Sequence, residues 1–316
     1  MRQRFFIIII AVLVALSLVF GGLYLHERNS LSSSGQSRYP LLAQRLFQEN
    51  PSDVVINFQP LRADIKSYLA SVGVKHSFYF QYLFTGTTIR DGDSNLLVGA
   101  SLMKIPIVMD LYKAVEEGKI SLDKNVVVPS DVPGGDDKNF GNQENLKAGD
   151  QITLRKASEI ALNESDNTAA YTVFEAIDGL LSTQDQALNN LDVELQDSTS
   201  ADGPPYVMIS SRSYASILSC LYFSCFLSLK DSQAVLNNLT NSPDDNGLRG
   251  GVPQSVLVAH KIGSFSTITQ SDCGIVYVPN RRYLLCIMMD EGTAGASQHI
   301  KKLSQMVYDY VNKLNP

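Results

Sequence analysis

The first strongly apolar segment of the chain covers residues 5–25, FFIIIIAVLVALSLVFGGLYL, and contains no charged residue. A helix of this length spans roughly 30 Å, the thickness of the hydrocarbon core of a membrane. Because Arg2 and Arg4 precede the segment, the positive-inside rule keeps the N-terminus in the cytoplasm and exports the remainder of the chain. We therefore predict a single-pass transmembrane helix that anchors the chain, with residues 1–27 as the anchor and an extracytoplasmic domain after it. A cleaved signal peptide is the alternative, but no small-x-small cleavage site follows the segment.

Residues 28–58 separate this anchor from the first predicted element of the folded domain. Their first part, NSLSSSGQSRY, is rich in serine and poor in large apolar residues, which is typical of a flexible stalk or linker. From residue 59 onward apolar residues recur at helical spacing, which predicts that one domain covers residues 59–316. The positions that carry this first helical pattern are Leu61, Ile65, Leu69 and Val72.

Strand-like patterns lie near both ends of this domain. Alternating residues predict a strand over 76–84, with a turn at 85–87 into a second strand. A hairpin turn is predicted at 279–281. The β-rich segments of the C-terminal part are residues 256–262, 273–278 and 283–289.

Helical periodicity dominates the middle and the end of the domain. The middle helices are predicted at residues 103–118, 154–177 and 213–229, and the last helix carries apolar positions from Ile300 to Leu314 on one face. Strands at both ends with helices between them imply a sheet that is completed by distant segments. The pattern therefore predicts an α+β fold, in which N- and C-terminal helices flank an antiparallel sheet and a helical insertion lies beside it.

The composition excludes several classes of protein. The net charge of −6 and the absence of a basic run argue against nucleic-acid binding. Four cysteines are too few for a disulfide scaffold in 316 residues, and no His or Cys spacing indicates a metal site, so we expect neither metal nor cofactor. A disulfide between Cys273 and Cys286 would cross the predicted hairpin, whereas Cys220 and Cys225 are predicted to be core thiols.

The first of three motifs with candidate chemistry is S-x-x-K at Ser101–Lys104. Residues three apart share a helix face, so the amine of Lys104 can reach the hydroxyl of Ser101 at the start of a predicted helix. The N–H groups at a helix N-terminus favour developing negative charge, which suits a nucleophilic serine with a lysine as its base. The motif is weak alone, because a second copy occurs at Ser121–Lys124 and an N-capping serine is common.

The other two motifs are the tripeptide SDN at residues 165–167 and the tetrapeptide KIGS at residues 261–264. SDN lies at a break in a helical stretch, where a helix cap is the ordinary explanation. KIGS follows a β-like run, where an edge-strand lysine before a glycine is the ordinary explanation. All three motifs in this order, on a helix, a helix break and a strand, indicate one site.

These motifs resemble the S-x-x-K, S-D-N and K-T-G signature of the active-site-serine penicillin-recognising enzymes, and in particular the class A β-lactamases. The segments GASLMKIPIVMDLY, LNESDNTAAY, AHKIGS and DCGIVYVPNRRYLLCIMM are similar to class A sequences in the same order. The similarity covers about residues 59–316. It implies the β-lactamase/transpeptidase-like fold and the opening of β-lactams through an acyl-enzyme.

The resemblance also implies catalytic roles for three residues. Ser101 matches the nucleophile, and Lys104 matches the amine beside it. Ser165 matches the hydroxyl that passes a proton to the leaving nitrogen. A lysine with an unperturbed pKa near 10.4 is a poor base at neutral pH, but burial and a second nearby lysine would both lower that pKa.

Three further positions match substrate-binding groups of the family. Asn167 matches the side chain that contacts the catalytic lysine and the substrate amide. Lys261 matches the cation that faces the substrate carboxylate. The backbone N–H groups of Ser101 and Ser264 match the oxyanion hole, whose donors point at the tetrahedral oxygen.

Two departures from the family pattern affect the expected function. Ile262 replaces the threonine of K-T-G, so a hydroxyl that helps to hold the substrate carboxylate is missing. The E-x-x-L-N loop, whose glutamate activates the deacylating water, has no match between residues 167 and 212. Glu194 and Asp202 lie in this interval, and Asp202 is nearest in spacing, but neither is flanked by Leu-Asn. We therefore expect acylation of Ser101 followed by slow deacylation.

Three functions stay open from the sequence. The leading one is an extracytoplasmic, membrane-tethered serine hydrolase of class A β-lactamase type. The second is a D,D-peptidase or transpeptidase on peptidoglycan stem peptides, which uses the same motifs without the deacylating glutamate. The third is a non-catalytic penicillin-binding relic. The expected partners are a β-lactam or a D-Ala-D-Ala-type substrate and the membrane.

Overall fold

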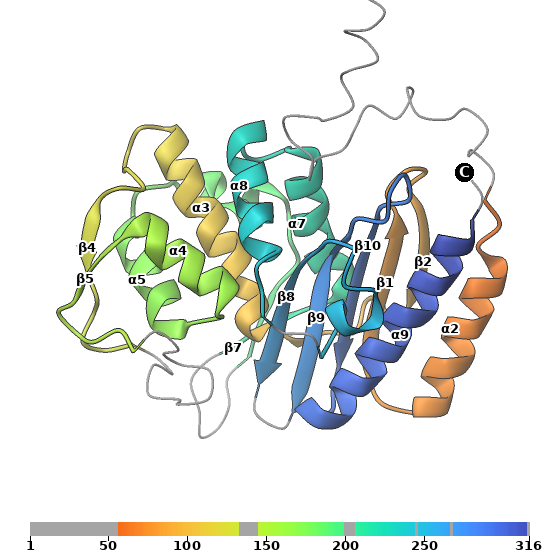
Figure 1. Cartoon of the computed structure of the whole chain (residues 1–316). Helices are drawn as coiled ribbons and strands as arrows, with labels where there is room; N and C mark the ends of the chain where they lie inside the picture. Colours follow the sequence, from red (N-terminus) through yellow and green to blue (C-terminus); the bar gives the residue numbers. More distant parts are fainter. Residues whose placement is uncertain (1–55, 133–144, 199–205, 244–245, 266–267, 315–316) are drawn as a thin grey trace, which may run out of the picture. The chain divides into compact units, whose positions relative to one another are not determined.

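The structure is a computed structural model that describes residues 56–132, 145–198, 206–243, 246–265 and 268–314 (Figure 1). The predicted anchor at residues 1–27 and nearly all of the predicted linker lie outside these residues. In the described part of the chain, no helix is both long enough and apolar enough to cross a membrane.

A five-stranded antiparallel sheet is built from the two ends of the domain. The N-terminal part supplies β1 (His76–Tyr82) and β2 (Thr87–Asp91), and the C-terminal part supplies β8 (Val258–Phe265), β9 (Thr269–Val276) and β10 (Tyr283–Met289). The strand order is β2-β1-β10-β9-β8, so β1 pairs with a strand from the far end of the sequence. This pairing confirms the predicted α+β architecture. It also places the KIGS motif inside β8, the edge strand, rather than after a strand.

Helices α2 (Gln59–Val72) and α9 (Thr293–Lys313) lie side by side on one face of this sheet (Figure 1). Their apolar faces are buried, as the helical spacing of both segments predicts. The buried residues that they contribute to the core beneath the sheet include Leu61, Ile65, Leu69, Ile300, Leu303, Val307 and Val311.

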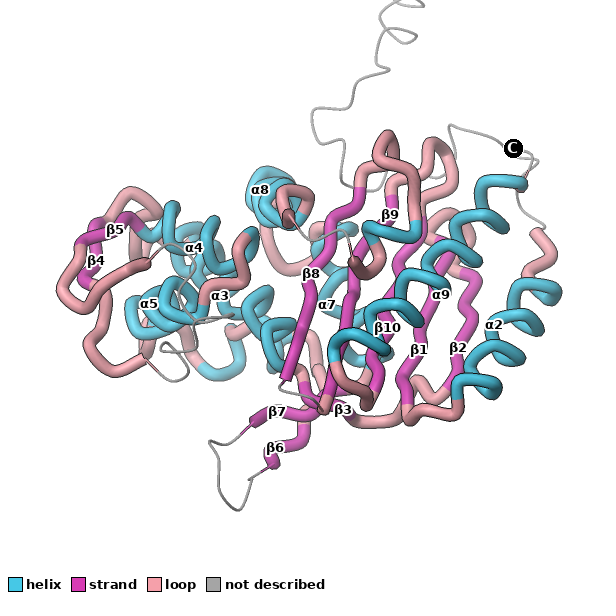
Figure 2. The backbone as a smooth tube through the Cα atoms, turned by 60° about the horizontal axis from the view of Figure 1, so that its bottom comes forward, coloured by secondary structure: helices cyan, strands magenta, loops and turns pink. Residues whose placement is uncertain are grey.

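A helical region lies beside edge strand β8, as both views show (Figures 1 and 2). It contains α3 (Lys104–Glu116), α4 (Leu154–Asn163) and α5 (Asn167–Ile177). Two more helices, α7 (Ser211–Phe223) and α8 (Leu229–Leu239), connect it to the sheet, because α7 packs against β1, β9 and β10 and α8 packs against β8. The predicted helical insertion is therefore confirmed.

Several short elements escape prediction because two to four residues are too few to show a period. The short strands are β3 (Leu97–Val98), β4 (Asn125–Val127), β5 (Gln151–Thr153), β6 (Gln196–Ser198) and β7 (Tyr206–Ile209). The short helices are η2 (Ala100–Met103), η3 (Thr183–Asp185), α6 (Ala187–Asn190) and η4 (Arg249–Gly251). Two of these elements, β3 and η2, lead directly into α3 and so set the position of Ser101.

The prediction for Cys220 and Cys225 is wrong, because the two residues form a disulfide. The predicted helix over 213–229 ends at Phe223, and Ser224 adopts a left-handed conformation with φ of 53°. That turn brings the two cysteine Cα atoms to 5.0 Å, and Cys225 is exposed beyond the helix end. Apolar periodicity alone did not show where the helix stops.

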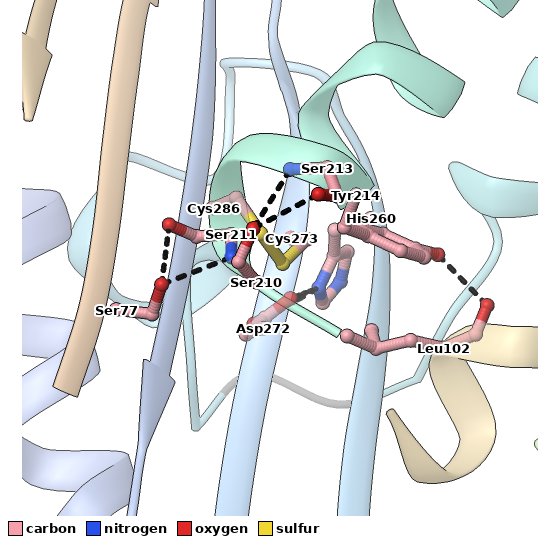
Figure 3. Close-up of a disulfide and its surroundings, with 10 residues drawn as sticks. All are labelled: Ser77, Leu102, Ser210, Ser211, Ser213, Tyr214, His260, Asp272, Cys273 and Cys286. Carbon is pink, nitrogen blue, oxygen red and sulfur yellow. Dashed lines mark hydrogen bonds and ion pairs between the residues drawn. A yellow bond between two sulfur atoms is a disulfide. The ribbon is translucent and has the colours of Figure 1, made fainter. Parts of the chain in front are cut away.

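The disulfide that the hairpin suggested, between Cys273 and Cys286, is present (Figure 3). The two residues lie directly opposite each other in the register of β9 and β10, and both are fully buried. A cross-link therefore joins β9, the neighbour of β8, to β10 on the side of the sheet that faces α7.

Tyr214 of α7 ties this helix to the turn that carries the candidate nucleophile. Its side chain is fully buried, and its hydroxyl donates a hydrogen bond of 2.9 Å to the backbone carbonyl of Leu102 (Figure 3). Burial raises the pKa of Tyr214 well above its ordinary value, so the phenol stays protonated and acts as a donor. The bond fixes the residue that follows Ser101.

Replacing Tyr214 with phenylalanine should remove this bond and leave the Leu102 carbonyl buried without its partner. We expect Tyr214→Phe to cost about 1–3 kcal/mol of unfolding free energy and to lower the thermal midpoint by several degrees. Thermal and denaturant unfolding measure the change. Tyr68→Phe is the matched control, because the Tyr68 hydroxyl bonds His299 at a partly exposed position and water can replace that contact. Equal losses of unfolding free energy in the two variants would show that the buried Tyr214 bond contributes no more to stability than the partly exposed Tyr68 bond.

Candidate active site

Ser101 lies in η2, one turn before α3 begins at Lys104, rather than at the first turn of the α-helix itself. The preceding Ala100 has φ of 44°, a conformation that residues other than glycine rarely adopt. Such strain costs on the order of 1–3 kcal/mol and persists only where the surroundings enforce it. Backbone bonds from Gly99 N–H to the carbonyl of Val207 (2.8 Å) and from Leu102 N–H to the carbonyl of Gly99 (3.0 Å) help to enforce it.

Lys104 is only 6% exposed, and its ammonium group is the centre of the site. Its Nζ atom lies 3.1 Å from Ser101 Oγ and 2.6 Å from Asn167 Oδ1. It also donates to the backbone carbonyl of Ser165 and lies 3.4 Å from Ser165 Oγ. The structure therefore brings the S-x-x-K and SDN motifs together, as one site requires.

The SDN motif occupies the short connection between α4 and α5. Ser165 has φ of 59°, a second strained position in the site. Asp166 is fully buried and caps α5, because its carboxylate accepts a 2.7 Å bond from the N–H of Ala169. The helix-cap explanation of this motif is therefore correct for Asp166, while Ser165 and Asn167 point toward Lys104.

Lys261 brings the third motif to the same place from β8. It is 3% exposed, and its Nζ atom donates to Ser165 Oγ at 2.7 Å and to the backbone carbonyl of Ile262 at 3.1 Å. Ser165 thus lies between two lysines, and a proton on its hydroxyl can pass between them. The structure thus brings Ser165 and Lys261 to the same place as Lys104, and the roles that the resemblance implied for them stay predictions.

Gly263 lets β8 approach the turn that carries Ser101. A Cβ atom at this position would lie 3.0 Å from the Gly99 carbonyl oxygen and 3.0 Å from Leu102 Cγ, closer than side-chain carbons ordinarily pack. Only glycine fits without moving the strand or the turn. The sequence showed this glycine as part of a motif, but the close approach of backbone to backbone is visible only in the structure.

A buried histidine–aspartate pair holds β8 from its opposite face. His260 and Asp272 are each 1% exposed, and His260 Nδ1 lies 2.9 Å from Asp272 Oδ1 (Figure 3). Asp272 also accepts a 2.7 Å bond from the N–H of Leu248. Because consecutive strand residues point to opposite faces, this pair fixes the strand immediately behind Lys261. His260 is therefore part of the buried interior of the sheet.

The two lysines and Asp166 set the electrostatics of the site. Burial lowers the pKa of Lys104 well below its ordinary value, and the charge of Lys261 lowers it further. The carboxylate of Asp166 acts in the opposite direction, but it does not cancel the first two effects. A lysine in these surroundings releases its proton more readily than a surface lysine does, which is the property that a general base requires.

The remaining predicted residues take less central positions. Ser264 donates its hydroxyl to Gln270 Oε1 on the neighbouring strand, so its side chain is engaged within the sheet. Ile262 lies on the same face of β8 as Ser264, opposite Asp272 in register. In the described part of the chain no cluster of His, Cys, Asp or Glu is arranged to hold a metal ion.

The structure offers no strong substitute for the missing glutamate among the residues that it describes. Glu194 is exposed in the connection between α6 and β6, and Asp202 lies outside the described residues. Among described carboxylates, Asp166 acts on Lys104, but its role as a buried helix cap keeps it from a water-activating position. The second S-x-x-K serine, Ser121, is exposed in a loop after α3 and takes no part in the site.

Solved structures share this fold at low sequence identity. PBP-A superposes with a TM-score of 0.69 at 23% identity, covering 81% of this chain and 97% of PBP-A. A point mutant of PBP-A, solved as an acyl-enzyme complex with penicillin G, gives a TM-score of 0.68 at the same identity and coverage. A β-lactamase from Sphaerobacter thermophilus gives 0.70 at 20% identity, covering 83% of this chain and all of the other.

A search of curated proteins gives no match. A family model, by contrast, matches residues 60–311, nearly all of the described domain. This match agrees with the resemblance that the three motifs carry and with the shared fold. The chain belongs to the Beta-lactamase enzyme family.

Proposed function

We propose that the chain is an extracytoplasmic serine hydrolase of class A β-lactamase type, which opens β-lactams through an acyl-Ser101 intermediate. The observation that carries this proposal is the position of Lys104 Nζ, which lies within hydrogen-bond distance of both Ser101 Oγ and Asn167 Oδ1. A buried amine with a lowered pKa beside a hydroxyl is the arrangement that activates a serine nucleophile.

The first step transfers an acyl group to the serine. Neutral Lys104 removes the proton from Ser101 Oγ as this oxygen attacks the carbonyl carbon of the substrate. The backbone N–H groups of Ser101 and Ser264 stabilise the negative charge that develops on the carbonyl oxygen. The proton that Lys104 took from Ser101 then reaches the leaving nitrogen through Ser165, whose hydroxyl gives its own proton to the nitrogen and takes up the one from Lys104. Ser165 Oγ lies 3.4 Å from Lys104 Nζ and 2.7 Å from Lys261 Nζ.

The second step, removal of the acyl group by water, has less support. No carboxylate other than the capping Asp166 acts on Lys104 among the described residues. We therefore propose slow deacylation. The same observation favours a second candidate function, a D,D-peptidase or transpeptidase that acts on peptidoglycan stem peptides. A non-catalytic relic is disfavoured, because a relic does not require two buried lysines within reach of one serine.

The location of the protein is also part of the proposal. The uncharged segment 5–25 after Arg2 and Arg4 supports a single-pass anchor with the domain outside the cytoplasm. A domain tethered to the outer side of the membrane would meet both β-lactams and cell-wall peptides.

Ser101→Ala should abolish covalent labelling by a fluorescent penicillin. The thermal midpoint should stay within a few degrees of wild type, because a hydroxyl in an open site adds little stability. Ser121→Ala, in the second S-x-x-K motif, is the matched control and should label normally. Labelling that survives in Ser101→Ala would place the nucleophile elsewhere.

Acylation of Ser101 should rise with pH, because Lys104 accepts a proton only in its neutral form. Lys261→Met removes the neighbouring positive charge, so the pKa of Lys104 should rise and the acylation profile should move to higher pH. Stopped-flow acylation at saturating penicillin measures the midpoint separately from substrate binding. Lys119→Met, at an exposed surface lysine, is the control and should leave the midpoint unchanged. An unshifted midpoint in Lys261→Met would exclude electrostatic coupling between the two lysines.

Mixing the protein with excess penicillin should give a rapid burst of one equivalent, followed by very slow turnover of the remaining drug. The loss of a well-placed general base typically costs roughly 10²–10⁴-fold in rate, so the acyl-enzyme should accumulate. Intact-mass spectrometry should then show a persistent adduct of the mass of the drug on Ser101. Rapid hydrolysis without a detectable adduct would contradict slow deacylation, and Glu194→Gln and Asp202→Asn would then test the two remaining carboxylates.

A further inference from the structure

Helix α5 exposes a single stripe, and this stripe begins at the candidate active site. Asn167, Tyr171 and Phe174 follow one another at spacings of four and three residues, which places them on one face of the helix. The other faces are occupied by packing. The buried residues of α5 are Thr168, Ala169, Ala170, Thr172, Val173 and Ile177.

Two aromatic rings occupy the outer part of this stripe. The rings of Tyr171 and Phe174 stack with centroids 6.0 Å apart and an interplanar angle of 27°. Phe174 is 45% exposed, unlike the apolar residues on the other faces of the helix. The negative faces of aromatic rings attract organic cations, and ammonium groups in particular.

Two carboxylates flank the rings. The Tyr171 hydroxyl is hydrogen-bonded to the side chain of Glu175, which raises the pKa of Tyr171, and the exposed Asp131 adds a second negative charge nearby. The tyrosine hydroxyl is thus the donor in this bond, and the glutamate side chain accepts it. An exposed phenylalanine ring and a partly exposed tyrosine ring next to two carboxylates form a surface that complements a positive charge.

The distance between the site of acylation and the aromatic rings sets the length of a ligand that could contact both. Asn167 Oδ1 lies 2.6 Å from Lys104 Nζ, so the inner end of the stripe is at the site of acylation. Phe174 follows seven residues later, which is about 10 Å along the helix axis. An extended side chain of about eight bonds on the acyl donor spans this distance.

We propose that Tyr171, Phe174 and Glu175 form a subsite for a primary ammonium group, which the acyl donor carries on a flexible side chain about 10 Å from its reacting carbonyl. The inference rests on the proposed acylation of Ser101. It adds the substrate class, namely acyl donors with a terminal amine, and applies equally to β-lactams and to peptides.

The test compares three penicillins that differ only in the amide side chain. One carries an ω-aminohexanoyl group, the second carries the same group with its amine acetylated, and the third carries a plain hexanoyl group. Acylation efficiency at Ser101 is measured by intact-mass kinetics for each compound. We expect the free amine to react about fivefold to tenfold more efficiently than either neutral compound, an effect that salt should reduce.

Two variants should remove this preference without changing the reaction itself. Glu175→Gln deletes the charge and Phe174→Ala deletes the exposed ring, and both side chains lie outside the contacts of Ser101 and Lys104. Each variant should be acylated by benzylpenicillin at the wild-type rate. Phe223→Ala is the matched control, because Phe223 on α7 is 46% exposed and should leave the preference intact.

The outcomes separate the subsite from the proposed function. Equal efficiency of the three penicillins in the wild-type protein would overturn the subsite, and so would a preference that survives in both variants. A preference for the hexanoyl compound would show that the stripe binds an apolar group instead. If benzylpenicillin fails to acylate the wild-type protein, the proposed function fails and the subsite fails with it.

Discussion

The site depends on the burial of two lysine side chains within reach of one serine hydroxyl. Ser165 Oγ lies 2.7 Å from the Nζ atom of Lys261 and 3.4 Å from that of Lys104. Two positive charges in a buried site repel each other and are poorly solvated. One of the two lysines therefore gives up its proton at a pH where a surface lysine would keep it. The pKa of Lys104 is lowered, and this lysine adjoins Ser101. Burial and repulsion together therefore lower the pKa of Lys104, as the proposed role of a general base requires.

The rest of the fold can be understood as the means of holding these groups together. Ser101 and Ser165 lie in connections that contain left-handed residues, with φ of 44° at Ala100 and 59° at Ser165. Neither conformation is stable alone, so the surrounding elements must impose it. On one side the buried Tyr214 hydroxyl holds the Leu102 carbonyl. On the other side the absence of a side chain at Gly263 lets β8 come into contact with the turn. Strain at the site is thus offset by packing outside it.

Two kinds of feature could be predicted from the sequence. They are long elements whose apolar residues recur at a regular spacing, and short motifs that carry the candidate chemistry. The helical faces of α2 and α9 and the pairing of the chain ends in one sheet follow from apolar spacing, because burial of one face dictates the pattern. The three motifs gave the residues around Lys104. The left-handed turns at Ala100 and Ser165 could not be predicted, since tertiary contacts impose them. The bond between Tyr214 and Leu102 and the disulfide between Cys220 and Cys225 join residues whose proximity depends on where helices end.

The groups that form an acyl-enzyme and those that would remove it come from different parts of the chain. Ser101, Lys104, Ser165 and Lys261 are fixed by buried helices and by an edge strand, and they match the family residue by residue. A deacylating carboxylate would have to come from the segment between α5 and β7, where the described residues form only short elements and Glu194 is exposed. The same helix α5 leaves its stripe at Tyr171 and Phe174 uncovered by described residues. If Ser101 acylates readily and deacylates slowly, as proposed, an exposed surface beside it favours recognition of a longer acyl donor over rapid hydrolysis of a small one.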